Sequence, residues 1–326
     1  MGSLAPVAPR IPPPGVYVPM LAFFTPDTTK IDVTTTQRHA IRLANAGVAG
    51  LVVHGSNGEA AHLTHPERTT IIKAVVEAVQ KECDRPLPVI AGCGAQSVLE
   101  TVELCRAAAQ AGATQALVLP PGYYAGLLGP ESHIQFFHEV ADASPIPILI
   151  YNFPAAANGV DLNSDTLLTI AKHPNVVGVK LTCGNTGKLA RVVAETAKFR
   201  QDDFRVFGGS ADFILQGAVV GADGTISGLA NLSPVACCRI IELFEAGKLA
   251  EARALQAEVA AADWLMIRYG FPGVKAAMPM FYGKGEETAC TMRKPTRPVS
   301  EKAMQEIRAG VEAVIAIESR FLKERK

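Results

Sequence analysis

The sequence has no imbalance of charge and no long apolar segment. Its 326 residues contain 31 Lys+Arg and 31 Asp+Glu, so the formal net charge is zero. A balanced chain lacks the basic footprint that attracts nucleic acid or an anionic membrane surface. No uninterrupted apolar run is long enough to cross a bilayer. We therefore expect neither nucleic acid nor a membrane among its partners.

The seven cysteines and the N-terminal residues lack the patterns of an exported protein. The chain has no Cys-x-x-Cys pair and an odd number of cysteines, which is typical of reduced thiols in a cytosolic protein. Residues 1–14 are rich in proline and alanine and contain one arginine. They lack the apolar segment of a secretory signal and the repeated arginines of a transit peptide. We expect a flexible arm here and a cytoplasmic protein.

Strand and helix patterns alternate eight times along residues 15–247. Short apolar runs predict the strands at 16–24, 50–53, 87–91, 115–119, 146–151, 175–180, 204–207 and 224–227. This alternation implies parallel strands with right-handed crossovers. Eight units in this length fit a closed (β/α)₈ TIM barrel of the α/β class better than an open sheet. No Gly-x-Gly-x-x-Gly turn follows the first strand, so a dinucleotide-binding fold has little support.

Two long helices are predicted after the barrel, at 249–268 and 301–324. Both combine alternating charge with an apolar stripe. Residues 248–326 would therefore form a C-terminal helical extension of the same domain. Periodicity alone leaves open whether these helices pack on the side of the barrel or take part in a subunit contact.

The segment 175–184 reads Asn-Val-Val-Gly-Val-Lys-Leu-Thr-Cys-Gly, an apolar strand that carries Lys180 at its end. Burying an amine is costly unless the amine is neutral or paired. An amine that is partly neutral is also what carbonyl chemistry through a Schiff base requires. The alternative is a lysine that buries its stem and extends its charged end into water.

Other polar residues follow the remaining strands, at the end of a barrel where active sites lie. Tyr151 ends the fifth predicted strand, next to the strand of Lys180. Lys180 and Tyr151 are candidate catalytic residues, and Tyr123, after the fourth strand, lies on the same rim. The candidate substrate-binding residues are Ser56, Asn57, Gly58, Gly209, Ser210 and Ile226.

These residue types suit Schiff-base chemistry on a 2-oxo acid. The amine of Lys180 could attack the C2 carbonyl, and the resulting iminium would accept electrons from the adjacent C3–C4 bond. Tyr151 could move protons during these steps. The turn Gly55-Ser56-Asn57-Gly58 offers a hydroxyl, an amide and backbone N–H groups to the substrate carboxylate. This mechanism needs no cofactor and no metal.

A metal-dependent aldolase is the chemical alternative. His54, His62 and His65 lie close in sequence to Glu59 and could hold a Lewis-acid metal. However, His65 precedes Pro66 at an expected helix start, and no spacing fixes two imidazoles on one helix face. A local count of histidines is weak evidence for a site.

With these residues in place, the sequence resembles the dihydrodipicolinate synthase / N-acetylneuraminate lyase family of class I aldolases. The matching motifs, in order, are Gly55-Ser56-Asn57-Gly58-Glu59, Tyr151-Asn152-Phe153-Pro154, Val177-Gly178-Val179-Lys180 and Phe271-Pro272-Gly273-Val274-Lys275. The resemblance implies a Schiff base on Lys180 and a proton relay through Tyr151. It also implies that Tyr123 crosses a dimer interface to complete a relay with Ser56, within a dimer of dimers. Gly122 departs from the family's usual Pro-Tyr-Tyr loop.

Two departures narrow the substrate that the resemblance implies. Dihydrodipicolinate synthases carry an arginine for a second carboxylate just after Tyr-Asn-x-Pro, whereas residues 155–159 here read Ala-Ala-Ala-Asn-Gly. The Ser56-Asn57 pair resembles 4-hydroxy-2-oxoglutarate aldolases and fungal L-threo-3-deoxy-hexulosonate (2-keto-3-deoxy-L-galactonate) aldolases.

The segment Lys-Leu-Thr-Cys-Gly-Asn at 180–185 and the N-terminus without a presequence pattern favour the fungal enzyme. That enzyme would release pyruvate and L-glyceraldehyde in sugar-acid catabolism. A hydroxyoxoglutarate aldolase, another lyase or dehydratase of the family, and a non-catalytic binding barrel are the alternatives.

Overall fold

The computed structural model describes residues 9–200, 202–282 and 291–324. Eight parallel strands form a closed barrel in which each strand pairs with the next in sequence and β1 pairs with β8. The strands are β1 (Gly15–Pro19), β2 (Gly50–Val53), β3 (Val89–Gly92), β4 (Gln115–Val118), β5 (Ile148–Asn152), β6 (Val176–Leu181), β7 (Arg205–Gly208) and β8 (Gly224–Ile226). The predicted (β/α)₈ barrel is confirmed.

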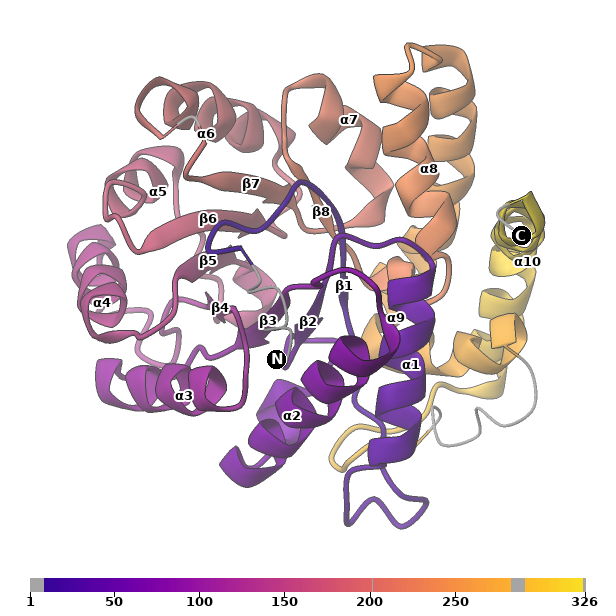
Figure 1. The fold of residues 1–326 in the computed structure, drawn as a ribbon, viewed down its shortest axis with the longest axis horizontal. Coiled ribbons are helices and arrows are strands. Elements are labelled where there is room, and N and C mark those ends of the chain that lie inside the picture. Colours follow the sequence, from indigo (N-terminus) through magenta and orange to yellow (C-terminus); the bar gives the residue numbers. More distant parts are fainter. Residues whose placement is uncertain (1–8, 201, 283–290, 325–326) are drawn as a thin grey trace, which may run out of the picture.

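Eight helices surround the strands (Figure 1). They are α1 (Val33–Asn45), α2 (His65–Glu82), α3 (Val98–Gln110), α4 (Pro130–Ala143), α5 (Ser164–Ile170), α6 (Thr186–Phe199), α7 (Ile214–Val219) and α8 (Pro234–Glu245). Four of these helices are capped at the N-terminus by a side chain that accepts a hydrogen bond from a backbone N–H. The capping residues are Asp32, Ser97, Asn163 and Asn185.

The first strand is shorter than its apolar run predicts. β1 ends at Pro19, although residues 20–24 remain buried. The side-chain amide of Asn231 donates to the Pro19 carbonyl at 2.9 Å, so a side chain binds this backbone oxygen. Hydrophobicity therefore marks burial along the whole run, whereas the sheet includes only its first part.

Two further helices complete the chain, α9 (Leu249–Tyr282) and α10 (Glu301–Glu324). α9 is longer than the predicted helix at 249–268, and Gly270 interrupts it with φ 62° and ψ −159°. Glycine accepts this positive φ, which costs other residues energy. α10 packs against α8 and α9, outside the ring of helices (Figure 1).

Residues 9–14, which the sequence analysis assigns to a flexible arm, are held against the barrel. Arg10 donates to the side chain of Asn175 at 3.0 Å, just before β6. The Gln115 side chain, at the start of β4, donates to the carbonyls of Pro9 and Arg10. This segment therefore covers the N-terminal ends of the strands, and residues 1–8 lie outside the described chain.

The second half of α9 is tied to the opposite end of the barrel by a buried ion pair. The Lys275 ammonium lies 2.5 Å from a Glu59 carboxylate oxygen, and both side chains are fully buried. Lys275 also donates to the Thr291 carbonyl at 2.7 Å. The pair thus joins α9, the segment after residue 290 and the loop that follows β2.

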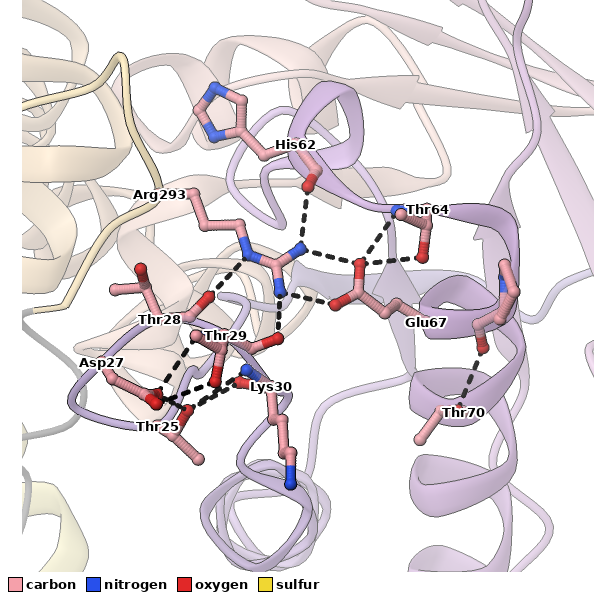
Figure 2. A network of polar contacts seen from close by, with 11 residues as sticks. Thr25, Asp27, Thr28, Thr29, Lys30, His62, Thr64, Glu67, Thr70 and Arg293 are labelled. Atoms are coloured by element: carbon pink, nitrogen blue, oxygen red, sulfur yellow. Dashed lines mark hydrogen bonds and ion pairs between the residues drawn. The ribbon is translucent and has the colours of Figure 1, made fainter.

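Arg293 makes a second connection to the same region (Figure 2). Its guanidinium binds both carboxylate oxygens of Glu67, on α2, at 2.7 and 2.5 Å. It also donates to the carbonyls of Thr28 and His62, each at 3.0 Å. Hydrogen bonding to Arg293 lowers the pKa of Glu67 to about 2.

None of the helices in the described residues has the length and apolarity to cross a membrane. Six cysteines are free thiols, and Cys290 lies outside the described residues.

The Glu67–Arg293 pair predicts a stability that depends on pH. Because the folded pKa of Glu67, about 2, lies below its ordinary 4.5, the contribution is complete above pH 4.5 and is lost as the pH falls toward 2. We expect Glu67→Gln to lower the free energy of unfolding by about 1–3 kcal/mol at pH 7, as measured by urea denaturation.

Glu77→Gln on the exposed face of α2 is the matched control. The difference between Glu67→Gln and the wild type should narrow below pH 4.5. A difference that stays constant from pH 7 to pH 3 would contradict the assignment to Glu67.

Candidate active site

Lys180 and Tyr151 lie side by side at the C-terminal ends of β6 and β5, where the two residues are register partners. Their exposed fractions are 3% and 4%. The Lys180 Nζ atom lies 4.2 Å from the centroid of the Tyr151 ring. Among the described residues, no carboxylate lies within ion-pair distance of Lys180. The amine is therefore buried beside a phenol rather than paired with an acid.

Ser56, in the loop after β2, lies next to this pair. Its hydroxyl lies 3.4 Å from the Tyr151 hydroxyl, at the long end of the hydrogen-bond range. The three side chains come from loops and strands that are distant in sequence and meet at one end of the barrel. The structure thus brings together the three residues on which the sequence-based mechanism depends.

A cavity of about 430 Å³ opens beside Lys180. Of the predicted residues, its walls include Ser56, Asn57, Tyr151, Lys180, Gly209, Ser210 and Ile226. Gly58 does not line it, and its N–H donates to the Gly55 carbonyl within the turn. Gly58 therefore shapes the turn that presents Ser56 and Asn57.

The turn after β7 can approach β6 closely because it contains Gly209. A Cβ at this position would lie 2.0 Å from the Thr182 Oγ1 atom and 2.5 Å from the Thr182 Cα atom. Real Cβ atoms do not come this close to other heavy atoms, so a larger residue would force the two loops apart. Gly209 therefore sets the width of the cavity between β6 and β7.

Asp263, from the first half of α9, holds the same turn and was not predicted. Its Oδ2 atom accepts hydrogen bonds from the Ser210 hydroxyl at 2.6 Å, the Ala211 N–H at 2.7 Å and the Asp212 N–H at 3.0 Å. Burial raises the pKa of Asp263 to about 6, and the charge of Asp212 adds to this, whereas the Ser210 hydroxyl opposes it.

The sequence contains one signal for Asp263. The residue is 2% exposed and occupies the apolar side of its helix, with Val259 one turn earlier and Met266 one turn later. A carboxylate within an apolar stripe requires buried hydrogen-bond donors. The pattern could therefore have indicated a buried role, although not the turn that Asp263 contacts.

Tyr123 lies away from the cavity of its own chain. Its side chain is 75% exposed, and its ring packs against Tyr124 at a centroid distance of 4.9 Å. Gln96 fixes the loop by accepting a hydrogen bond from the Tyr123 N–H at 2.8 Å. A relay through Tyr123 therefore requires a second copy of the chain.

The histidines of the metal hypothesis do not converge. His62 binds one oxygen of Glu59 at 2.9 Å, while Lys275 occupies the other oxygen. His65 faces Glu100 on α3 at 3.4 Å. His54 is buried, and burial lowers its pKa to about 3. Within the described ranges, no group of three metal-binding side chains forms.

A smaller cavity of about 340 Å³ adjoins the first. It shares Ser56 and Tyr151 with the main cavity and also contacts His62 and Arg68. Ser56 and Tyr151 thus line both spaces.

The cavity of Lys180 lacks a cation that could hold a second substrate carboxylate. Residues 154–156 form a short 3₁₀ helix after β5, and none of them is basic. Among the described residues that line the cavity, Lys180 is the single basic side chain. This agrees with the departure from dihydrodipicolinate synthases seen in the sequence.

Comparison with known proteins identifies the family. Residues 12–314 match the profile of the Dihydrodipicolinate synthetase family. The chain belongs to this family. A protein of Emericella nidulans, named as a probable mitochondrial 4-hydroxy-2-oxoglutarate aldolase, is 49% identical over 92% of this chain and 93% of its own length.

Two further relatives extend this comparison. The L-threo-3-deoxy-hexylosonate aldolase of Hypocrea jecorina is 42% identical over 96% of this chain and 99% of its own. A prophage protein of the family from E. coli K12, solved in complex with pyruvate, is 27% identical with a TM-score of 0.83. That match covers 92% of this chain and 98% of the other.

The close approach at Gly209 predicts that Gly209→Ala destabilises the protein. The added methyl group would overlap Thr182 and force the β6 and β7 loops apart, a strain of about 1–3 kcal/mol. Gly126→Ala is the matched control, since its methyl group would have no neighbour within 4 Å. Urea denaturation should show the loss for Gly209→Ala alone, and equal stabilities would disprove the tight contact.

Proposed function

We propose that the protein is a Schiff-base aldolase that reversibly cleaves a 2-keto-3-deoxy sugar acid to pyruvate and a small aldehyde. The observation that carries this proposal is the buried amine of Lys180, which faces a cavity beside the Tyr151 phenol. Membership of the family and the aldolase names of two relatives support it. The preferred substrate is L-threo-3-deoxy-hexulosonate, which would yield L-glyceraldehyde.

The reaction begins when the Lys180 amine attacks the substrate C2 carbonyl and the resulting carbinolamine loses water. The iminium then accepts the electron pair of the breaking C3–C4 bond, while the C4 hydroxyl gives up its proton and becomes the aldehyde. The enamine that remains takes a proton at C3. Hydrolysis releases pyruvate and restores the amine. In this mechanism Tyr151 accepts and returns these protons, and the Ser56 hydroxyl, 3.4 Å from the Tyr151 hydroxyl, can exchange a proton with it.

The turn after β2 can bind the substrate carboxylate. The N–H groups of Ser56 and Asn57 have no acceptor in the described chain, and both residues line the cavity. Consecutive free N–H groups in a turn form a site for an anion. The Ser56 hydroxyl and the Asn57 amide add side-chain donors. This arrangement would hold the C1 carboxylate with C2 near Lys180.

A second candidate activity is 4-hydroxy-2-oxoglutarate cleavage. The relative from Emericella nidulans, whose name carries this activity, has the higher identity of the two named aldolases. That substrate would release glyoxylate, which has a carboxylate, instead of glyceraldehyde. An assay of both cleavage products separates the two activities.

The exposed tyrosine loop supports a dimer. Tyr123, Tyr124 and Leu127 expose 75%, 60% and 82% of their side-chain areas. Large exposed apolar side chains on one loop are typical of an interaction surface. In our proposal, Tyr123 enters the smaller cavity of a second subunit and completes a relay with Ser56, within a dimer of dimers.

The cellular setting is a further part of the proposal. We place the enzyme in the cytoplasm and in D-galacturonate or related sugar-acid catabolism, and the free cysteines of the described residues fit a reducing compartment. The name of the relative from Emericella nidulans places that protein in mitochondria. Fluorescence of a C-terminally tagged chain in cells would decide between the two compartments.

Borohydride reduction in the presence of pyruvate tests the mechanism directly. We expect the wild-type protein to gain the mass of one reduced pyruvate, located on the peptide that contains Lys180. Lys180→Ala should gain none, whereas exposed Lys172→Ala should behave as the wild type. An adduct that persists in Lys180→Ala, or that never forms in the wild type, would rule the mechanism out.

A mixture of two inactive variants tests whether Tyr123 acts across the interface. Tyr123→Phe and Lys180→Ala homodimers should each be slow, but a heterodimer would rebuild one complete site. Random reassortment of equal amounts should restore about a quarter of the wild-type sites. If mixing after dissociation restores no activity, Tyr123 does not serve the partner's site.

A further inference from the structure

His54 combines a left-handed backbone with a buried side chain that lacks a hydrogen bond. It follows β2 directly and has φ 57°. This conformation costs residues other than glycine energy, and such residues are concentrated at functional sites. His54 is 4% exposed, and its Nε2 atom has no hydrogen bond in the described chain. The aldolase mechanism above assigns no role to this imidazole.

Two glycines enclose the backbone of His54. A Cβ at Gly92, the last residue of β3, would lie 2.0 Å from the His54 carbonyl oxygen. A Cβ at Gly58 would lie 3.1 Å from the His54 backbone nitrogen. Backbone strain persists only where the surrounding structure holds it, and these close approaches do so here. The unpaired nitrogen is therefore a fixed feature of the fold.

The imidazole lines the smaller cavity together with two hydroxyl groups of the proposed relay. His54, Ser56 and Tyr151 all contact this space of about 340 Å³. Its other walls include apolar side chains, among them Leu117 and Phe271. A buried polar atom without a partner calls for a group that supplies the hydrogen bond. An aromatic ring that ends in a hydroxyl group matches both the apolar and the polar walls.

The His54 ring is neutral in this setting. Burial lowers its pKa to about 3, and the charge of Arg68 adds to this effect. Arg68 lines the same cavity, and its guanidinium donates to the carbonyls of Ala60 and Gly92. When the hydrogen of a neutral imidazole is on Nδ1, the Nε2 atom accepts a hydrogen bond. His54 can therefore hold a hydroxyl group without becoming charged.

The loop of Tyr123 presents such a ring to a second copy of the chain. The Gln96 side-chain oxygen accepts hydrogen bonds from the N–H groups of Gly122 and Tyr123, at 3.0 and 2.8 Å. The Asn158 side chain donates to the Gly122 carbonyl at 3.3 Å. Two neighbouring loops thus hold the backbone, while Tyr123 is 75% exposed. A loop that is already ordered loses little entropy when its ring enters a cavity.

We propose that His54 accepts a hydrogen bond from the hydroxyl group of the partner subunit's Tyr123 and thereby fixes the direction of the proton relay. The oxygen of that tyrosine then accepts from Ser56, and the Ser56 oxygen accepts from Tyr151. The Tyr151 oxygen is left to accept a hydrogen bond from the substrate. This inference rests on the proposed aldolase function and its dimer. His54 is a positioning residue, because it contacts the relay and not the substrate.

Two substitutions of His54 isolate the hydrogen bond. His54→Leu removes the acceptor, whereas His54→Gln keeps an amide oxygen near the position of Nε2, and both place a side chain on the same left-handed backbone. We expect kcat for cleavage to fall about tenfold in His54→Leu and to recover to within about threefold of the wild type in His54→Gln. KM should stay unchanged in both. His65→Leu, at an exposed histidine, is the control and should keep the wild-type kcat.

A double-mutant cycle tests whether His54 acts through Tyr123. If it does, adding His54→Leu to Tyr123→Phe should change kcat by less than about twofold, because the hydrogen bond is already absent. Losses that multiply would show that His54 binds water or another group, and they would overturn the proposal.

Mixed dimers test whether the two residues come from different subunits. In a heterodimer of His54→Leu with Tyr123→Phe, one site keeps His54 and receives an intact Tyr123. Random reassortment of equal amounts should restore about a quarter of the wild-type sites. A mixture of His54→Leu with Lys180→Ala should restore none, because His54 and Lys180 belong to the same chain's site. Restoration in the second mixture, or in neither, would contradict the assignment.

Two further measurements separate this inference from the proposed function. Absence of borohydride trapping of pyruvate in the wild type would overturn the aldolase function and this inference with it. A mixture of Tyr123→Phe with Lys180→Ala that stays inactive would overturn the dimer relay. If both experiments succeed and His54→Leu keeps the wild-type kcat, the role of His54 alone is wrong.

Discussion

The buried ion pair between Lys275 and Glu59 is the constraint on which the active end of the barrel depends. Both side chains are fully buried, so each needs the other to offset its loss of hydration. Removing one partner of such a pair costs about 3–5 kcal/mol, because the remaining charge stays buried. Glu59 has a left-handed backbone, with φ 50°, directly after the turn that contains Ser56 and Asn57. The pair therefore fixes the Ser56-Asn57 side of the cavity as well as α9.

α9 contacts turns on both sides of the cavity, because Gly270 divides this helix into two halves. The half before Gly270 carries Asp263, which holds the β7 turn, and the half after it carries Lys275, which holds the β2 turn. A straight helix could not direct side chains toward both turns, whereas the change of direction at Gly270 permits this. The extension beyond the barrel thus determines the shape of the cavity, although the barrel would close without it.

Local patterns predict the fold and the centre of the site well. Eight apolar runs with intervening helices specify the barrel, and the ends of the fifth and sixth runs place Tyr151 and Lys180 side by side. Such a prediction succeeds because strand order and residue position determine the location of these side chains. Asp263 and the tie between Lys275 and Glu59 depend on tertiary packing of α9, which no local period encodes. Tyr123 shows a third case, since its expected partner lies in another subunit and a single chain leaves it exposed.

The charged groups that line the cavity are arranged so that none of the acids pairs with Lys180. Among the described residues, Lys180 has no acid within ion-pair distance, and the two acids that line its cavity are Asp212 and Asp263. If a carboxylate paired directly with Lys180, it would hold the amine as a cation that cannot attack a carbonyl. Asp263 instead accepts hydrogen bonds from the Ser210 hydroxyl and from the N–H groups of Ala211 and Asp212. The carboxylate of α9 therefore shapes the turn after β7, and among the described residues the amine of Lys180 is left without an ion-pair partner.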